Sequence, residues 1–401
     1  MLCMIDPSTQ LIHHPYKPPA GFESIPPGVF KASTITFPSV AALRSRDWKN
    51  KTGYTYGLHG TPTTFTLEER IATLEGGTFC TLVPSGLAAV VLVGMALLKA
   101  GDEMLIPDNA YGPNKAFAEG ELAAWGVTHR FYDPMNPADL AAKLSAGTRL
   151  VWLEAPGSIT LEFPDLPALV AAVKAHAVCH PQGIVTALDN TWGAGIAFNA
   201  FTLGADISAH ALTKYPSGGA DVLMGSVVTN DEALHQMIHF CHMRVGYGVA
   251  GNDCELVLRG LNSIALRYAA HDAATRVLAS WLKSQSQIEA VFHPALPGSP
   301  GHETWKRDCS AAACLVSAVF KPEFSPQQID HFCDSLKLFK LGYSWAGPMS
   351  LCVPYDIPAI RTATKWPYKG GLVRFSVGLE ATPDLQSDIG QALSAMQYSK
   401  G

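Results

Sequence analysis

The sequence predicts an α/β protein in which a large, mostly parallel sheet is covered by helices on both faces and is followed by a smaller α+β domain. Three observations predict this class. Short apolar runs alternate with helix-length segments as far as about residue 230, and helical patterns dominate after that. Apolar residues make up 48% of the 401 residues against 16% charged residues, so the chain can bury a large core and subunit interfaces.

Residues 1–60 are rich in proline and aromatic residues and show no sustained periodicity. We expect an extended arm there, with one short helix at 40–48. Because such an arm cannot bury itself, it should wrap a neighbouring domain or subunit. Residues 61–251 would then form the large, ligand-binding domain, and residues 252–401 the C-terminal domain.

The large domain is predicted to begin with a helix at 64–77, which has acidic residues in its early turns and two glycines at its end. A segment without charged residues follows at 82–98, where Ser85 and Gly86 open an apolar helix. It has only 17 residues and contains Pro84, so it predicts a buried helix and not a membrane span.

Further short apolar runs and longer helical patterns alternate along the chain. In the large domain, strands are predicted at 79–83, 103–106, 129–132, 149–153, 184–188 and 223–229, and helices at 85–99, 114–125, 166–176 and 231–244. In the C-terminal domain, helices are predicted at 252–284 with a break near Gly260, 326–335 and 382–396, and strands at 311–320 and 372–377. Ligands of such sheets bind at the carboxyl ends of strands, where Ser85, Glu154 and Asp189 stand.

Charge and cysteine content narrow the class of protein. The net charge is −5 and no run of basic residues stands out, so nucleic-acid or anionic-membrane binding is not expected. The nine cysteines are scattered and form no C-x-x-C pair, which is typical of reduced thiols in a cytoplasmic protein. The N-terminus shows no secretory signal pattern, and a cytoplasmic location is therefore expected.

Lys214 is the candidate nucleophile. It lies in the stretch D-I-S-A-H-A-L-T-K-Y-P-S-G-G-A-D (206–221), where the preceding residues are apolar and Thr213 adds a hydroxyl. An amine held partly away from water loses proton affinity and can react with a carbonyl cofactor. The alternative is an ordinary solvated lysine, since most lysines lie on the surface.

Other residues supply what a pyridoxal phosphate (PLP) site needs, each with a structural alternative. The turn at 84–87 can present backbone N–H groups to a phosphate, although Ser-Gly starts many helices. Tyr111 can stack on a flat ring or simply pack. Asp189, at a strand end, can bind a protonated pyridine nitrogen or cap the next turn. Arg374, in an apolar strand, can clamp a carboxylate, but from the strand alone a snorkelling or ion-paired arginine is favoured.

A metal site is not expected. His235, His239 and His242, with Cys241, have helical spacing that could suggest zinc. No fourth ligand follows at a familiar spacing, and histidines on an apolar helix more often pack against neighbours.

A dozen motifs in one order resemble the Cys/Met-metabolism family of PLP-dependent enzymes over nearly the whole chain. They include Y-G-L-H-G-T-P-T-T (56–64), L-E-G-G (74–77), P-S-G-L-A-A (84–89), A-Y-G-P (110–113), L-E-A-P-G-S-I-T (153–160), D-N-T-W (189–192), T-K-Y (213–215), Y-S-W-A-G (343–347) and R-F-S-V-G-L-E (374–380). The resemblance implies the aspartate-aminotransferase-like fold, PLP-dependent transferase fold type I, and a homotetramer built from two dimers with sites shared across each dimer.

By position, the resemblance also implies roles for single residues. Lys214 would bind the PLP aldehyde covalently and shuttle protons, Asp189 would bind the pyridine nitrogen, and Tyr111 would stack on the ring. The phosphate would be bound by Gly86, Leu87 and Thr213. Tyr56, from a neighbouring subunit, would also bind the cofactor, and Tyr56 and Tyr111 would be catalytic residues together with Lys214. Arg374 would take the substrate α-carboxylate beside Tyr343, Ser344 and Trp345.

The reaction implied is β-elimination, because the family's γ-acting enzymes tend to carry glutamate where this chain has Tyr343. L-Cystathionine, or another S-substituted cysteine, would give a thiol, pyruvate and ammonia. Three residues depart from the family pattern: Leu58 replaces an arginine, with His59 as another source of charge, and Gly219 and Met349 replace a histidine and a glutamate. A γ-acting enzyme and a weakened homologue with a binding or regulatory role therefore remain alternatives.

Overall fold

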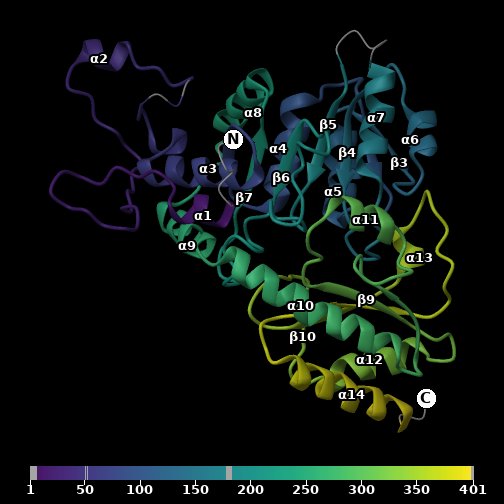
Figure 1. Ribbon diagram of the computed structural model, residues 1–401. Helices are drawn as coiled ribbons and strands as arrows, with labels where there is room; N and C mark the ends of the chain where they lie inside the picture. Colours follow the sequence, from purple (N-terminus) through teal and green to yellow (C-terminus); the bar gives the residue numbers. More distant parts are fainter. Residues whose placement is uncertain (1–6, 50, 52, 178–182, 399–401) are drawn as a thin grey trace.

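Two β-sheets, one of seven strands and one of five, organise the fold, which the computed structural model describes for residues 7–49, 51, 53–177 and 183–398 (Figure 1). The N-terminal arm, purple in Figure 1, extends beyond the side of the large sheet. Its short helices are α1 (Pro7–Ile12), α2 (Val40–Arg44) and η1 (Gly57–His59). The chain between α1 and α2 has no helix or strand, as the sequence predicts.

The large sheet has the strand order β1-β7-β6-β5-β4-β2-β3. Neighbouring strands are parallel from β6 to β3, whereas β7 runs antiparallel to both β1 and β6. The predicted fold class is therefore confirmed. The strands are β1 (Phe79–Val83), β2 (Glu103–Pro107), β3 (Thr128–Tyr132), β4 (Thr148–Glu154), β5 (Val185–Asp189), β6 (Ile207–His210) and β7 (Gly225–Thr229).

Helices bury both faces of the large sheet, which is why inner strands such as β4 and β6 are buried along nearly their whole length, whereas the edge strand β3 alternates. In β4, Val151 and Leu153 pack in the core beneath α3, α6 and α7, while Leu150 and Trp152 pack in the core beneath α4, α5 and α8. The helices are α3 (Pro62–Glu75), α4 (Gly86–Leu97), α5 (Gly112–Phe117), which continues into a π-turn η2 (Ala118–Leu122), α6 (Pro137–Lys143), α7 (Leu166–Ala177) and α8 (Glu232–Val245).

The small sheet has the order β10-β11-β12-β9-β8 and lies below the large sheet in Figure 1. In β9, Val316 and Ala318 pack against α10, α12 and α14, whereas Leu315 and Val319 belong to the same core as the large sheet. The elements are α9 (Gly251–Leu261), α10 (Ile264–Lys283), β8 (Ile288–Phe292), α11 (His302–Asp308), β9 (Leu315–Phe320), α12 (Pro326–Ser335), β10 (Lys340–Leu341), β11 (Leu351–Tyr355), α13 (Ile357–Ile360), β12 (Leu372–Ser376) and α14 (Thr382–Tyr398).

Four strands, β6, β8, β10 and β11, and the helices α1, η1, α6, α11 and α13 were not predicted from the sequence. The reason for β6 is its length: it has four residues, all buried, so no alternation marks it. The predicted break near Gly260 is confirmed, because α9 ends at Leu261. The domain limits at residues 60 and 251 stay a prediction, since the small sheet shares a core with the large one.

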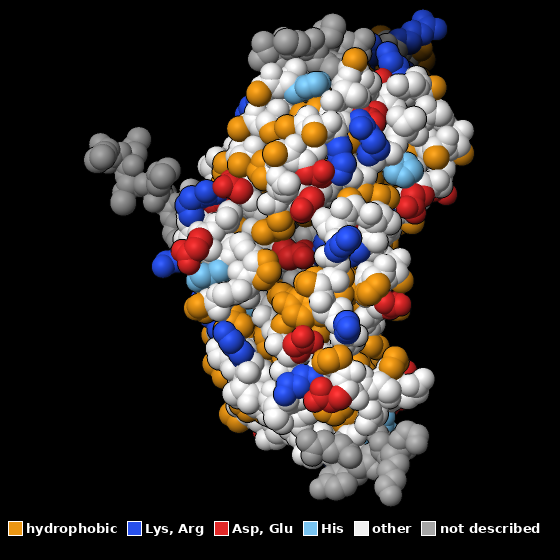
Figure 2. Space-filling model, turned by 90° about the vertical axis from the view of Figure 1, so that its right-hand side faces the viewer, with side chains coloured by type: hydrophobic (Ala, Val, Ile, Leu, Met, Phe, Trp, Pro, Cys, Tyr) orange, Lys and Arg blue, Asp and Glu red, His pale blue; other side chains and the backbone are white. Residues whose placement is uncertain are grey.

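The surface charge is mixed on one face, and the helices of the described part are too short or too polar to span a membrane. On the face drawn in Figure 2, lysine and arginine side chains are interspersed with aspartate and glutamate. Among the helices of the described residues, none is long and apolar enough to cross a bilayer.

Candidate active site

The described residues enclose a cavity of about 640 Å³ at the carboxyl ends of β2, β4, β5 and β6. Leu315, Tyr355 and Arg374 of the small sheet also line it. Of the eleven residues predicted for the site, ten line this cavity and Tyr56 does not. The ten are Gly86, Leu87, Tyr111, Asp189, Thr213, Lys214, Tyr343, Ser344, Trp345 and Arg374.

Lys214 lies just after β6, and its amine is held in an unusual environment. Nζ donates a hydrogen bond to Ser344 Oγ at 2.8 Å and lies 5.1 Å from the centre of the Trp345 ring. Burial, and then the positive charge of Arg374, lower the pKa of Lys214 to about 8. About a tenth of this amine is therefore unprotonated at pH 7, against less than about a thousandth of a lysine with the usual pKa. The unprotonated form is the one that a nucleophile or general base requires.

The N-terminus of α4 forms one end of the cavity. Ser85 caps the helix, and its Oγ accepts from the N–H of Ala88 at 3.0 Å. The N–H groups of Gly86 and Leu87, in the first turn, precede the intrahelical ladder and can bind an anion. A Cβ at Gly86 would lie 2.5 Å from the Cβ of Ala211, so glycine lets the helix approach the segment that carries Lys214.

Thr213 lines the same end of the cavity, but its hydroxyl is already engaged. It donates to the Met224 carbonyl at 3.2 Å and accepts from the Met224 N–H at 3.1 Å. To donate to a phosphate, its proton would have to turn away from Met224.

Two carboxyl groups stand side by side where β4 and β5 end, since Glu154 pairs in register with Asp189. Asp189 accepts from the Thr191 N–H at 2.9 Å, and desolvation raises its pKa. Burial and the Asp189 charge raise the pKa of Glu154 well above its usual value. Among the described residues no lysine or arginine pairs with Asp189, and this arrangement fits a cationic group placed in the cavity.

Arg374 is 5% exposed, and its guanidinium donates to two backbone carbonyls, Ser158 at 2.9 Å and Tyr343 at 3.1 Å. Burial lowers its pKa. No carboxylate among the described residues forms an ion pair with it, so the snorkelling or ion-paired interpretation favoured by the strand alone is wrong. A buried guanidinium of this kind fits a substrate carboxylate.

Tyr111 precedes α5 and is 39% exposed at the cavity. Its backbone N–H donates to Glu154 Oε2 at 2.7 Å, while desolvation and the charge of Asp189 raise the pKa of its phenol. Glu154 thus orients the loop that carries Tyr111. Glu154 and Ser158 were not among the predicted site residues, although Glu154 stands at a strand end where such residues are expected.

The residues that depart from the family pattern, Leu58, Gly219 and Met349, do not line the cavity. Tyr56 is 47% exposed and precedes η1, next to His59. Burial, then Arg46, lower the pKa of His59, which favours the neutral imidazole in the single chain; the replacement of an arginine charge by His59 stays a prediction.

The histidines of α8 form a stack of rings. Ring centroids of His235 and His239 lie 5.7 Å apart, and those of His239 and His242 6.3 Å apart. Burial lowers their pKa values to about 4, 3 and 4 respectively, so the rings are neutral at pH 7. Within the described ranges, no group of three or more His, Cys, Asp or Glu is arranged to hold a metal ion.

Pyridoxal phosphate fits the cavity. The start of α4 suits its phosphate, the unpaired Asp189 suits a protonated pyridine nitrogen, and the Lys214 amine suits its aldehyde. The fold and this site together define a PLP-dependent enzyme of fold type I.

Comparison with known proteins agrees. The chain belongs to the Cys/Met metabolism family of PLP-dependent enzymes, whose family model matches residues 8–394, and PLP is therefore its cofactor. It is 37% identical to the cystathionine β-lyase of Bordetella avium (94% of both chains) and 37% identical to cystathionine β-lyase MetC of Escherichia coli K12 (90% of this chain and 91% of the relative). The crystal structure of metB from Corynebacterium glutamicum is similar at a TM-score of 0.88 and 28% identity, covering 98% of this chain and 99% of that one.

Proposed function

We propose that this protein is a carbon–sulfur β-lyase that cleaves L-cystathionine, or a related S-substituted cysteine, to a thiol, pyruvate and ammonia. The observation that carries the proposal is the Lys214 amine, close to Ser344 and in the same cavity as the unpaired Arg374 guanidinium. An amino-acid carboxylate bound to Arg374 would bring its Cα proton toward this amine. The similarity to two cystathionine β-lyases supports the same reaction.

The residues would act in a defined order. Arg374 binds and orients the substrate α-carboxylate, and Lys214, held by Ser344, removes the Cα proton. When bound, PLP supplies an electron sink for the electrons released at Cα. Asp189 would hold the ring nitrogen in its protonated form, and Tyr111, a neutral phenol at pH 7, would pack against the ring.

The assembly proposed is a cytoplasmic homotetramer of two dimers, with Tyr56 reaching the cavity of the neighbouring subunit. Its 47% exposure and its place outside the cavity of its own chain support this role. The exposed apolar side chains of the arm, among them Phe22, Ile25 and Trp48, support burial against a second copy.

The keto acid formed from cystathionine tests the reaction type. We expect pyruvate, because proton removal at Cα places the electrons next to Cβ, from which the thiolate leaves. A lactate-dehydrogenase-coupled assay with chromatographic identification of the keto acid measures it. Finding 2-oxobutyrate instead would indicate a γ-acting enzyme, and absence of turnover on every cysteine thioether, with PLP bound stoichiometrically, would indicate a binding or regulatory protein.

The lowered pKa of Lys214 has a consequence that does not require substrate. Only the unprotonated amine reacts with the PLP aldehyde, so the rate of reconstitution of the apoprotein should rise with pH and level off above about 8. An ordinary lysine would give a rise that continues toward its usual value near 10.4. Stopped-flow absorbance of PLP binding measures this profile, and a midpoint above 10 would contradict the proposed environment.

A further inference from the structure

The connection between β11 and β12 is unusually long. These strands are antiparallel neighbours, and Tyr355 pairs directly with Leu372. A hairpin joining such residues needs only about two to five residues, whereas here residues 356–371 leave the small sheet and return to it. We call this segment the strap. In Figure 1 it includes α13 and runs, in yellow, up to the loops of the large sheet.

The middle of the strap is bound by Asp108, the residue that directly follows β2. The Asp108 carboxylate accepts from three successive backbone N–H groups, those of Thr362, Ala363 and Thr364, at 2.9 to 3.1 Å. It also accepts from the hydroxyls of Thr362 and Thr364 and from Lys115 Nζ at 3.1 Å, which lowers its pKa to about 2 although burial opposes the change. Lys115 Nζ donates in turn to the Ile360 carbonyl at 2.8 Å.

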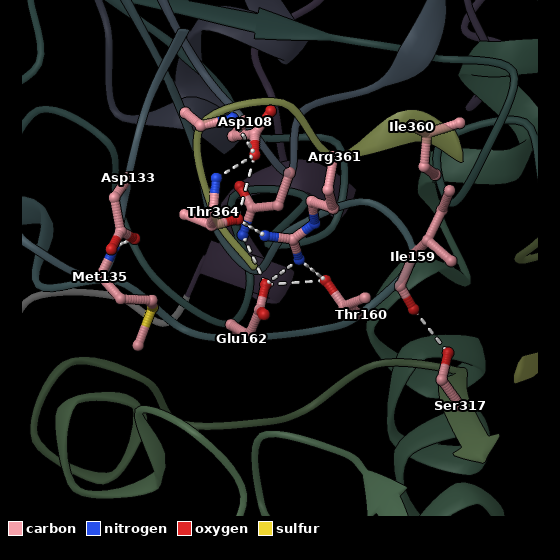
Figure 3. Close-up of polar contacts among 12 residues, drawn as sticks. Asp108, Asp133, Met135, Ile159, Thr160, Glu162, Ser317, Ile360, Arg361 and Thr364 are labelled. Carbon is pink, nitrogen blue, oxygen red and sulfur yellow. Dashed lines mark hydrogen bonds and ion pairs between the residues drawn. The ribbon is translucent and has the colours of Figure 1, made fainter. Parts of the chain in front are cut away.

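A second contact binds the strap to the loop after β4 (Figure 3). The Arg361 guanidinium donates to Glu162 Oε2 and to Thr160 Oγ1, each at 2.6 Å, and to Thr364 Oγ1 at 2.8 Å. The positive charge of Arg361 is therefore neutralised by Glu162. Because of this ion pair, the Arg361 guanidinium, which lines the cavity, is not free to attract a charged group of the substrate.

The loops that hold the strap also carry site residues. Asp108 stands three residues before Tyr111, and the loop that contains Glu162 also contains Ser158, whose carbonyl accepts from Arg374. The strap itself contributes Ile357, Ile360 and Arg361 to the cavity lining. Ile357 is 1% exposed, but Ile360 is 42% exposed at the cavity, so its side chain can meet a bound molecule.

We propose that the strap is the specificity-determining wall of the substrate cavity. Ile360 contacts the substituent on the substrate sulfur, and Asp108 acts as the positioning residue that holds Ile360 in place. With the α-carboxylate on Arg374 and Cα at Lys214, the S-substituent extends past Tyr111 to this wall, and the Ile360 side chain limits the size of the substituent that fits. The inference rests on the proposed β-lyase function and deepens it by assigning selection of the S-substituent to residues outside the catalytic set.

Substitutions at Ile360 test the wall. The hydrogen bond from Lys115 is accepted by the backbone carbonyl of Ile360, so changing the Ile360 side chain removes none of the hydrogen bonds that hold the strap. The ratio of kcat/KM for S-benzyl-L-cysteine to that for S-methyl-L-cysteine is measured with the holoenzyme. We expect Ile360→Ala to raise it about tenfold and Ile360→Phe to lower it, since a pocket discriminates by one or two carbon groups on this scale. Val277→Ala, at an exposed position of α10 outside the cavity lining, is the control and should leave the ratio unchanged.

Limited trypsin digestion tests whether the contacts of Asp108 and Glu162, called the anchor here, hold the strap in place, and it does so without measuring activity. The strap carries the exposed residues Lys365 and Lys369. Asp108→Asn, and independently Glu162→Gln, should increase the cleavage rate after these lysines about tenfold, because cleavage follows the fraction of released strap. Asp139→Asn on α6 is the matched control. Far-UV circular dichroism shows whether each variant is folded, and the Glu162 variant decides the test if the Asp108 variant is not.

Each of the three statements, that Ile360 forms the wall, that Asp108 and Glu162 anchor the strap and that the protein is a β-lyase, is overturned by a different result. If the wild-type holoenzyme turns over thioethers but the substrate ratio of both Ile360 variants equals that of the wild type, the wall is overturned and the β-lyase function stands. Cleavage rates equal to those of the wild type in folded Asp108 and Glu162 variants overturn the anchor. A wild-type protein that forms no keto acid from any thioether overturns the proposed function and, with it, the role of the strap in specificity.

Discussion

Lys214→Ala is expected to lower kcat/KM for cystathionine by at least about 10³-fold, because it removes the group proposed both to bind the PLP aldehyde and to take the Cα proton. General acid–base catalysis alone contributes about 10²- to 10⁴-fold. The amine is suited to both tasks by its low pKa of about 8 and by its hydrogen bond to Ser344. Steady-state pyruvate formation and the visible absorption band of the purified holoenzyme measure the two losses together.

The control for this variant is Lys143→Ala. Lys143 pairs with Asp139 on α6, on the surface and outside the cavity lining, so its loss should change neither activity nor spectrum. A Lys214→Ala protein that kept both the wild-type absorption band and wild-type turnover would contradict the whole proposed site.

Arg374→Ala should raise KM for cystathionine and lower kcat/KM about 10²- to 10³-fold, since truncating one partner of a buried charge pair costs about 2 to 5 kcal/mol. The guanidinium is 5% exposed and donates only to the Ser158 and Tyr343 carbonyls among the bonds found in the described chain. Its remaining donors therefore have a substrate carboxylate as the natural acceptor. Initial-rate kinetics over a range of substrate concentrations measure the loss.

A second variant and a control separate carboxylate binding by Arg374 from a purely structural role. Arg374→Lys keeps a positive charge but loses the planar fork, so it should recover only part of the lost kcat/KM. Arg276→Ala, which removes an arginine paired with Asp272 on α10, is the control for deleting a guanidinium outside the cavity. If Arg374→Ala reduced thermal stability but left KM unchanged, carboxylate binding would have to be assigned to another residue.

How far the sequence could predict the site depended on the range of the interactions. The phosphate end is local: Ser85 caps α4, and Gly86 follows within the same turn, so sequence neighbours define it. Asp189 stands directly after an apolar run, and a strand end is readable from that run. Thr213 shows the limit of this reasoning, because its hydroxyl is engaged by the backbone of Met224, eleven residues away at the start of a predicted strand, and the strand pattern does not indicate this contact.

The sequence by itself determined the fold class, the family and the cofactor. Apolar runs and turn residues are local features of the chain, and the order of the motifs can be followed along the sequence without knowing which residues are in contact. Only the tertiary structure decided that Arg374 lacks a carboxylate partner and that the strap meets the cavity. The bond between Arg374 and Ser158 joins residues 216 apart, and the bond between Thr362 and Asp108 joins residues 254 apart. No local pattern records such contacts, since they form only when two sheets pack against each other.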